Sequence, residues 1–358
     1  MTKFSRRNFV KVAGAAATLP LLGRPAFAAD PLKVAFMYVG PVGDFGWTWA
    51  HDHARKQMEE QMAGAVTTSF VESVPEGPDA ERVLRELAQQ GNKLIFATSF
   101  GYMNQTMKVS QQFPDVKFEH ATGFQRTDNM ATYNARFHEG RAVLGTIAGH
   151  MSKSGIGGYI ASFPIPEVVM GINAFTLAAQ KVNPDFKTKV IWVNSWFDPA
   201  KEADATRAMI DQGVDVVTQH TDSPAPLQVA EERGIIGFGQ AADMTSFAPN
   251  AHMTAITDDW APYYIDRAQA VIDGTWTAGD TWKGIKEGFV GISPYNAAMP
   301  ADVVAAAEAV RTGIAAGTYD PFAGPINDQS GTERVAAGGS QDDGQLSGMD
   351  WYVEGVQS

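Results

Sequence analysis

Apolar and polar residues along this chain repeat one unit: an amphipathic helical pattern, a glycine, a short apolar run and a polar loop. The first apolar run covers residues 32–39, and a glycine-rich turn at 40–44 leads into a helical pattern that ends near Met62. Three later units place the apolar run just after the glycine: Gly91 with 93–98, Gly213 with 214–218, and Gly234 with 235–238. Glycine often ends a helix because it takes the left-handed conformation at little cost. Helices alternating with nearly all-apolar strands predict parallel sheets covered on both faces.

The repeated series predicts two lobes. It runs once up to about residue 150 and again up to about residue 257, and the 358 residues exceed what one hydrophobic core usually serves. We therefore predict an α/β protein in which two doubly wound parallel-sheet lobes are joined by a hinge. Lobe 1 is expected at 29–153, lobe 2 at 154–256, and residues 257–358 should return to lobe 1.

The pattern beyond residue 257 is less regular. Residues 259–273 indicate one helix and 302–315 another, with segments broken by glycine and proline between them. From Asp320 onward the chain is rich in glycine, aspartate, serine and glutamine. We expect this tail to form an extended polar wrap on lobe 1. The hinge is expected near 151–155 and 255–260.

The N-terminus indicates where the protein acts. Residues 5–11 match a twin-arginine export signal, with its arginine pair at Arg6 and Arg7, and a mild apolar stretch follows at 12–22. The small-x-small pattern at 26–28 is typical of a signal-peptidase cleavage site. The apolar stretch is too short for a membrane span of about 20 residues. We therefore expect residues 1–28 to direct Tat export to the periplasm.

Charge and cysteine content exclude several classes of function. The formal charge is −12, and the predicted signal removes basic residues only, so the mature chain is more acidic still. An acidic protein is a poor partner for nucleic acid or an anionic membrane surface. The absence of cysteine excludes disulfides, thiolate metal sites and a lipid-modified cysteine at the cleavage site. We expect no nucleic-acid partner and no membrane anchor.

The candidate ligand site lies in the loops that follow the strands, because open parallel sheets bind ligands at the carboxyl ends of their strands. Aromatic, carboxylate and amide side chains recur in these loops, at 43–49, 99–102, 194–198, 220–223, 240–243 and 257–260. A flat apolar ring with polar edges would suit such a set. Trp47 and Trp196 are the strongest stacking candidates. The other tryptophans that we expect to be structural are Trp49, Trp192, Trp276 and Trp282.

Enzyme signatures are weak. The sequence has no G-x-S-x-G elbow, Walker loop, H-E-x-x-H motif or G-x-G-x-x-G after the first strand. His51 and His53 are two apart in a helical pattern, so they point to different faces and make poor metal ligands. Among the histidines, His220 is the one most worth examining as a site residue, because it stands beside Asp222 in a candidate loop. We expect no catalytic residues, no metal and no cofactor.

Five segments carry a resemblance to a known family: 39–50, 96–102, 133–140, 193–200 and 239–243. At these segments the chain resembles the basic membrane protein family of ABC-transporter substrate-binding proteins, and the likeness covers nearly all of the mature chain. The resemblance implies a type I periplasmic-binding-protein fold, with two α/β lobes, a hinge and a ligand held between them. Several members of the family bind purine nucleosides between two aromatic side chains.

Position by position, Trp47 matches the first stacking aromatic, Trp196 the second, and Asp243 lies in the ligand-loop motif. Where nucleoside-binding relatives carry a ribose-associated aspartate and lysine, this chain has Ala241 and Asp258. The resemblance therefore implies a free base, with adenine favoured. The full set of predicted ligand-binding residues is Trp47, Phe100, Tyr102, Asn134, Trp196, Asp222, Gln240, Asp243 and Trp260.

The leading hypothesis is a periplasmic binding protein that delivers a purine to an ABC permease and its ATPase. A purine nucleoside-binding protein of the same type is the first alternative. A sensor lobe that feeds a receptor kinase or chemoreceptor is the second, and a periplasmic enzyme such as a nucleoside hydrolase is the third. A neighbouring permease and ATPase gene pair would favour the importer, a neighbouring histidine kinase the sensor, and substrate turnover the enzyme.

The export signal gives the first testable prediction. Arg6→Lys combined with Arg7→Lys should trap the precursor in the cytoplasm with its signal still attached, because twin-arginine export reads the arginine pair. Cell fractionation and immunoblotting measure the outcome. Normal delivery of the double variant to the periplasm would contradict the Tat assignment.

Overall fold

A computed structural model describes residues 30–358, and Pro31–Ser358 form one unit built around two mainly parallel sheets. The predicted twin-arginine signal and its cleavage site lie outside the described residues. The predicted alternation of helix, glycine and strand is confirmed along the sheets. For example, the helical pattern that ends at Gly234 forms α7 (Ala225–Arg233), and Gly234 takes the left-handed conformation with a φ of 68°.

Lobe 1 is a six-stranded sheet in the order β11-β5-β4-β3-β1-β2, and every pairing in it is parallel. Its strands are β1 (Leu32–Met37), β2 (Val66–Val71), β3 (Leu94–Ala97), β4 (Lys117–Ala121), β5 (Met130–Ala135) and β11 (Asp280–Lys283). Its helices are α1 (Trp47–Gln61), α2 (Pro78–Gln89), α3 (Met103–Ser110) and α8 (Ala261–Ile272).

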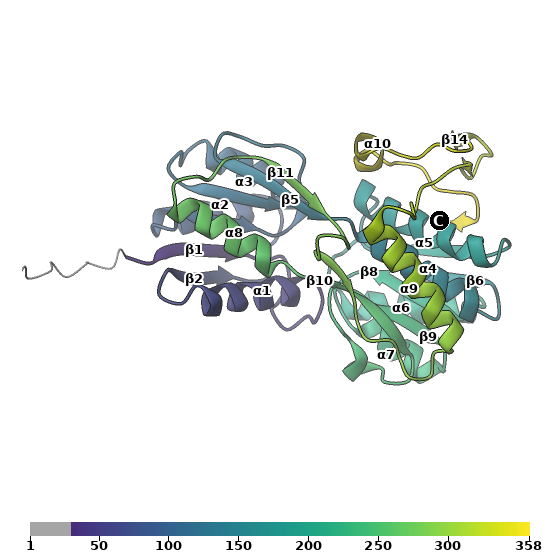
Figure 1. Cartoon of the computed structure of the whole chain (residues 1–358). Helices are drawn as coiled ribbons and strands as arrows, with labels where there is room; N and C mark the ends of the chain where they lie inside the picture. Colours follow the sequence, from purple (N-terminus) through teal and green to yellow (C-terminus); the bar gives the residue numbers. More distant parts are fainter. Residues whose placement is uncertain (1–29) are drawn as a thin grey trace, which may run out of the picture. The chain divides into compact units, whose positions relative to one another are not determined.

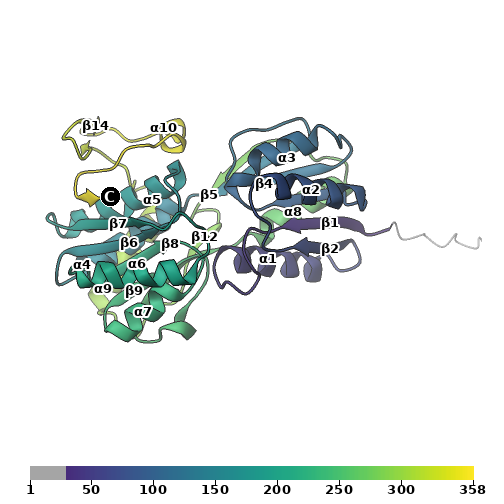
Figure 2. The same cartoon turned by 180° about the vertical axis from the view of Figure 1, so that it is seen from behind.

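Side chains of β1 alternate between the two faces of this sheet, as expected for a strand buried on both sides. Val34 and Phe36 pack in the core that includes α1 and α8, which lie side by side in Figure 1. Ala35 and Met37 pack in the separate core beneath α2 and α3, which Figure 2 shows from behind. The sheet is therefore a rigid base for the loops at its carboxyl edge.

Lobe 2 is a seven-stranded sheet in the order β12-β10-β9-β8-β6-β7-β15, in which only β12 runs antiparallel to its neighbour. Its strands are β6 (Ile156–Ala161), β7 (Lys187–Trp192), β8 (Val216–His220), β9 (Ile236–Gly239), β10 (His252–Asp258), β12 (Val290–Ile292) and β15 (Val356–Gln357). Its helices are α4 (Phe137–Met151), α5 (Pro166–Val182), α6 (Pro199–Asp211), α7 and α9 (Ala301–Ala316). Among the described residues, no helix is long and apolar enough to cross a membrane.

The chain passes between the lobes three times. It leaves lobe 1 after β5, returns between β10 and α8, and leaves again between β11 and β12. The first crossing therefore lies near Arg136 and not near 151–155, because α4 packs on α5 and α9 and belongs to lobe 2. The second crossing falls at 258–261, which overlaps the predicted segment 255–260. Residues 290–316 also lie on lobe 2, although we expected them on lobe 1.

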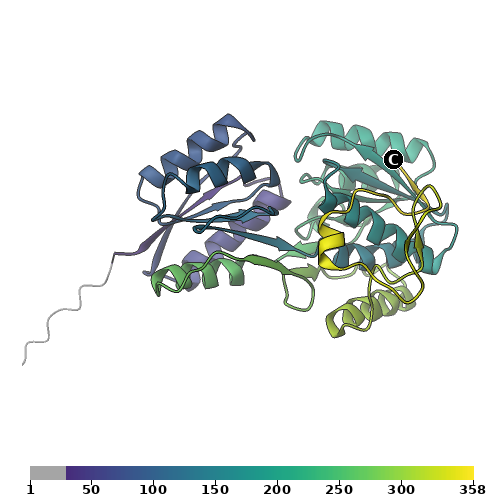
Figure 3. The same cartoon turned by 90° about the horizontal axis from the view of Figure 1, so that it is seen from above.

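The prediction that the polar tail wraps lobe 1 is wrong. The tail, which includes β13 (Ile326–Asn327), β14 (Glu333–Val335) and α10 (Asp343–Ser347), lies on lobe 2, as the yellow segment in Figure 3 shows. Its last strand pairs with the edge strand β7, which covers the free backbone groups of that edge. The buried side chain of Asn173 in α5 donates to Trp351 O at 2.8 Å and accepts from Val353 N at 3.0 Å. These specific contacts fix the tail, and its polar composition does not reveal them.

Candidate functional site

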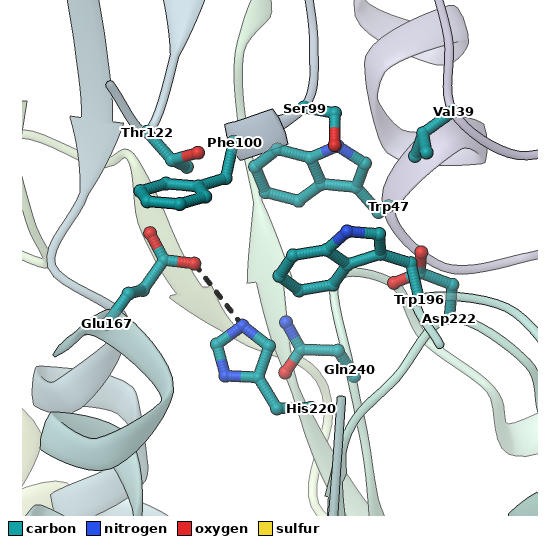
Figure 4. A pocket seen from close by; sticks show the side chains of 10 residues that line it. All are labelled: Val39, Trp47, Ser99, Phe100, Thr122, Glu167, Trp196, His220, Asp222 and Gln240. Carbon is teal, nitrogen blue, oxygen red and sulfur yellow. Dashed lines mark ion pairs between the residues drawn. The ribbon is translucent and has the colours of Figure 1, made fainter. Parts of the chain in front are cut away.

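The loops at the carboxyl ends of both sheets bound one narrow slot. It is lined by Val39, Trp47, Ser99, Phe100, Thr122, Glu167, Trp196, His220, Asp222 and Gln240 (Figure 4). With its mouth included, the slot holds about 340 Å³ of space that no atom fills. Lobe 1 supplies five of these residues and lobe 2 the other five, so the slot exists only where the two sheets meet.

Two tryptophans give the slot its apolar walls. Trp47 opens α1 of lobe 1, and Trp196 lies in the loop after β7 of lobe 2. The Trp47 indole nitrogen donates to Thr98 O at 2.6 Å, and the Trp196 indole nitrogen donates to Glu76 Oε1 at 3.2 Å. Because protein groups already satisfy both indole N–H groups, a ligand would meet the rings of these tryptophans and not their polar atoms, and both rings border the slot (Figure 4).

Trp260 supports this wall from behind and does not line the slot. Its side chain is fully buried, and its ring meets the Trp47 ring edge-on with 5.6 Å between centroids. The imidazole of His51 stacks on the Trp260 ring at 4.9 Å, and Phe137 packs against both tryptophans. Trp47 is therefore held by an aromatic cluster, which fixes its orientation toward the slot.

Asp44 holds the start of α1 in place. Its carboxylate accepts hydrogen bonds from the backbone N–H groups of Gly46 at 2.9 Å, Thr48 at 3.0 Å and Trp49 at 2.9 Å. These are N–H groups that a helix start leaves without partners, so the interaction caps α1. Burial nevertheless raises the pKa of Asp44 to about 6. The cap therefore orients the backbone of Trp47 at the edge of the slot.

Asp222 is the buried acid of the slot. Burial raises its pKa well above the ordinary value, and the neighbouring carboxylates of Asp44, Glu202 and Asp258 act in the same direction. The neutral acid form of Asp222 is therefore favoured. Its Oδ2 is buried and has no hydrogen-bond partner within residues 30–358. A neutral carboxyl can donate one hydrogen bond and accept others, so Asp222 suits a ligand edge that carries both an N–H and a ring nitrogen.

A second polar group faces the slot from the first turn of α5. Glu167 lies with Oε1 3.4 Å from His220 Nε2 and accepts from Asn134 Nδ2 at 2.9 Å through Oε2. Burial lowers the pKa of His220, which favours the neutral imidazole. Asn134 itself lines a larger adjoining chamber, about 890 Å³ with the open space at its mouth included, which shares Phe100, Thr122 and Glu167 with the slot. The Asn134 to Glu167 bond also joins lobe 1 to lobe 2.

Strained backbone is concentrated around the slot. The non-glycine residues with positive φ in the described chain are Phe45 (60°), Ser73 (55°), Thr122 (61°), Asn194 (52°) and Ala241 (64°). Thr122 lines the slot, and Phe45 and Asn194 each stand two residues before a tryptophan of the slot, Trp47 and Trp196. Such conformations cost about 1–3 kcal/mol each and cluster where a site must be held in one geometry. The loops are therefore fixed in shape, which favours a pre-formed site.

Five of the predicted site residues come together in the slot: Trp47, Phe100, Trp196, Asp222 and Gln240. Asn134 lies in the adjoining chamber. The structure corrects three other placements. Tyr102 is fully buried beneath the lobe 1 sheet and donates to Val74 O at 2.6 Å; Asp243 is exposed and accepts from Thr245 N at 2.9 Å; and Trp260 lies behind Trp47.

Sequence reasoning did not identify Val39, Thr122 and Glu167 as lining residues. Thr122 and Gly123, which follow β4, have neither an aromatic nor an acidic side chain, and Phe124 comes only after them. Glu167 follows the apolar strand 156–161 and stands just after Pro166, which begins α5. A strand end followed by proline and an acidic first turn is the signal that could have found it.

Comparison with known proteins places the chain in a family. A family model described as ABC transporter substrate-binding protein, PnrA-like, matches residues 32–312. The chain belongs to this family. A purine-binding protein of Brucella abortus is 59% identical over 336 residues, which cover 94% of this chain and 96% of that protein. A putative ABC transporter glucose-binding protein of Haloferax volcanii is 35% identical and covers 92% of this chain and 81% of its own length.

The solved structures agree on the fold. An ABC transporter solute-binding protein from Aeropyrum pernix superposes with a TM-score of 0.71 at 19% identity, covering 88% of this chain and 95% of its own. The predicted α/β periplasmic-binding-protein fold is thereby confirmed. In this substrate-binding protein the slot lies where parallel-sheet folds bind ligands, at the carboxyl ends of the strands.

One contact between the lobes requires a glycine. Gly46 lies against the backbone of Asp222, and a Cβ placed on Gly46 would come closer to Asp222 O than the 3.0 Å that real Cβ atoms keep. Because Gly46 belongs to lobe 1 and Asp222 to lobe 2, this approach brings the two loops together beside the stacking wall. Only glycine allows it without displacement of one backbone.

This contact predicts the effect of one added methyl group. Gly46→Ala should force the two loops apart and enlarge the radius of gyration measured by small-angle X-ray scattering. Gly43→Ala is the matched control, because Gly43 lies in the same turn and a Cβ added there would meet nothing within 4 Å. Scattering curves that are the same for Gly46→Ala, Gly43→Ala and the natural protein would refute the close approach.

Proposed function

We propose that this protein captures a free purine base, with adenine favoured, between its two lobes and delivers it to an ABC permease. One observation carries the proposal: two tryptophan faces, one from each lobe, wall a narrow slot whose remaining edge holds buried polar groups. The family, described as ABC transporter substrate-binding proteins, supports the transport role. The 59% identical relative from Brucella abortus, named a purine-binding protein, supports the ligand class.

Stacking explains why a purine suits the walls. A purine is flat and presents two π faces, and base–aromatic stacking is worth about 1–3 kcal/mol per base. An indole has a larger face than the phenyl ring of phenylalanine, and its N–H is bonded elsewhere in both tryptophans. Phe100 adds a third aromatic ring to the lining of the slot. The walls therefore contribute affinity without reading which purine is bound.

Polar groups at the edge of the slot can distinguish one purine from another, which the tryptophan walls cannot do. The ring nitrogens of adenine that carry no hydrogen accept hydrogen bonds, and its exocyclic amine and its ring N–H donate them. Asp222, whose buried Oδ2 has no partner among residues 30–358, and Glu167 are positioned to accept from N–H groups of the ligand. The amide of Gln240 also reaches the slot. Buried polar atoms without partners are costly, so a ligand that satisfies them gains affinity and one that does not is rejected.

The proposed role is binding without chemistry, followed by delivery. Closure of the lobes over a ligand is the signal that a binding protein gives to its permease. The Asn134 to Glu167 and Trp196 to Glu76 hydrogen bonds, both between lobes, are contacts that closure would form. We further propose export to the periplasm through the twin-arginine signal.

Two other ligand classes belong in the test. A purine nucleoside could place its base in the slot and its ribose in the adjoining chamber of about 890 Å³. A sugar is the second class, because the 35% identical relative from Haloferax volcanii is named a putative glucose-binding protein. Calorimetric titration of the natural protein with adenine, adenosine and glucose separates the three.

The stacking walls give a mutational prediction. Trp47→Ala and Trp196→Ala should each weaken adenine binding about ten- to a hundredfold, since each removes a stacking face. Trp47→Phe and Trp196→Phe should cost little because a π face remains. Trp49→Ala is the control: Trp49 lies two residues further along the same helix, stacks on His53 and does not line the slot. Full affinity in both alanine variants would show that the tryptophans are merely structural.

Ribose discrimination is the second prediction for this function. Asp258 lies behind the slot with both carboxyl oxygens buried and unpaired within the described chain, and burial raises its pKa well above the ordinary value. Neither it nor Ala241 replaces the charged ribose partners of nucleoside-binding relatives. Each unpaired hydroxyl costs about 1–3 kcal/mol, so adenine should bind at least about tenfold more tightly than adenosine. Equal or tighter binding of adenosine in direct titration would exclude the free-base assignment.

A further inference from the structure

The side-chain amide of Gln240 is held in one orientation by a buried arginine. Gln240 follows β9, is 2% exposed, and reaches the slot from lobe 2. Its Oε1 accepts a hydrogen bond from Nη2 of Arg141, which lies on α4 and is fully buried. Arginine has donors only, so the oxygen of the amide must face Arg141 and its NH₂ group must face the other way. Figure 4 shows the Gln240 nitrogen directed at the space beside the Trp196 ring.

Arg141 is itself fixed. Its Nη1 donates to Thr218 Oγ1 at 2.9 Å, and its Nη2 donates to Gln219 O at 2.6 Å as well as to Gln240. Thr218 and Gln219 belong to β8, so the guanidinium is anchored to the central strands of the lobe 2 sheet. A planar guanidinium with several partners holds its donors in fixed directions. The orientation of the Gln240 amide therefore follows from the sheet and not from the ligand.

The backbone around Gln240 is held as well. Ala241, the next residue, has a φ of 64°, which is unusual for a residue with a side chain. Its carbonyl accepts from Asp258 N at 3.1 Å, which ties the turn to the end of β10. Both ends of the Gln240 side chain are thus fixed, the backbone by this turn and the amide by Arg141.

We propose that Arg141 is a positioning residue that makes Gln240 a dedicated hydrogen-bond donor to the ligand, so that the slot selects purines with an acceptor at that edge. The inference rests on the proposed function and deepens it, because it names a feature of the purine that the site requires. A ring nitrogen without hydrogen satisfies the Gln240 NH₂ group. A C–H or N–H at the same place leaves that buried group without a partner, which weakens binding.

The other polar groups of the slot do not impose this requirement. Asp222 in its neutral form both donates and accepts, and His220 has a ring nitrogen whose role depends on its tautomer. Glu167 only accepts when ionised. Of the described lining residues, Gln240 is the one whose donor is fixed in direction by a buried cation.

The test is a binding cycle between protein variants and purine analogues. Adenine is compared with 1-deaza-, 3-deaza- and 7-deazaadenine, each of which replaces one ring nitrogen by C–H and keeps a flat stacking face. In the natural protein one analogue should bind about tenfold more weakly than adenine. In Gln240→Glu, which keeps the contact with Arg141 but removes the donor, adenine itself should weaken about tenfold or more and the penalty for that analogue should disappear. Stacking cancels in this comparison because both ligands stack.

Substitution of the arginine tests the positioning role. Arg141→Met should reduce the analogue penalty to about twofold or less while adenine still binds, because the amide is free to turn. Arg141→Gln places an amide there that can accept as well as donate, so it also lets the Gln240 amide turn, and it serves the same purpose if the methionine variant does not fold. Arg55→Met is the matched control, since Arg55 is a buried arginine that contacts Asp52, Glu59 and Thr68 away from the slot. That control should keep the full penalty.

The outcomes separate this inference from the proposed function. Failure of adenine to bind the natural protein would refute the proposed function. Tight adenine binding with no penalty for any deaza analogue would leave the proposed function intact and overturn the donor role of Gln240. An unchanged penalty in folded Arg141→Met or Arg141→Gln would overturn the positioning role of Arg141.

Discussion

The close approach of the loop after β1 to the loop after β8 is the constraint on which the site depends. Gly46 meets the Asp222 backbone where no side chain would fit, and Asp44 caps α1 from the same loop. Trp47 is the first residue of α1, the helix that Asp44 caps. The turn that brings the lobes together at Gly46 therefore also sets the position of the Trp47 wall. The second wall, Trp196, is tied to lobe 1 by its bond to Glu76. A single interface therefore sets the width of the slot and both of its faces.

Ionisable groups are buried around this interface, and their burial is tolerated because the acids favour their neutral forms and the arginine has hydrogen-bond partners. Burial raises the pKa of Asp222 and Asp258 well above the ordinary value, which favours their neutral forms. Arg141 remains as a cation within three hydrogen bonds, and the carboxyl of Asp258 lies within reach of its charge. A buried cation is costly unless such partners surround it. Its retention beside the slot, in a core that apolar residues could fill, is explained by the orientation that it imposes on Gln240.

The sequence was sufficient to predict the layered α/β lobes, because the glycine that ends a helix and the apolar run after it are local signals. It also indicated Trp47, Trp196, Asp222 and Gln240, since each follows a recognisable strand end. It failed where the answer depends on long-range packing. Nothing local shows that α4 joins lobe 2, or that the tail is captured by Asn173. Tyr102 and Trp260 look like ligand residues in sequence, but the tight packing of lobe 1 places them in the core.

In the proposed purine site, affinity and selectivity have separate physical sources. Stacking on Trp47 and Trp196 depends on the area and flatness of the ligand, which nearly all purines share, so the walls discriminate weakly between them. Hydrogen bonds at the edge are sensitive to the exchange of one donor for one acceptor, because a buried group without a partner costs more than a satisfied one gains. Discrimination is strongest where the protein group cannot rotate to suit the ligand. The Gln240 amide, held by Arg141 and by the strained turn at Ala241, meets that condition. In the proposed purine site we therefore expect it to dominate selection at the edge, while the tryptophans dominate binding.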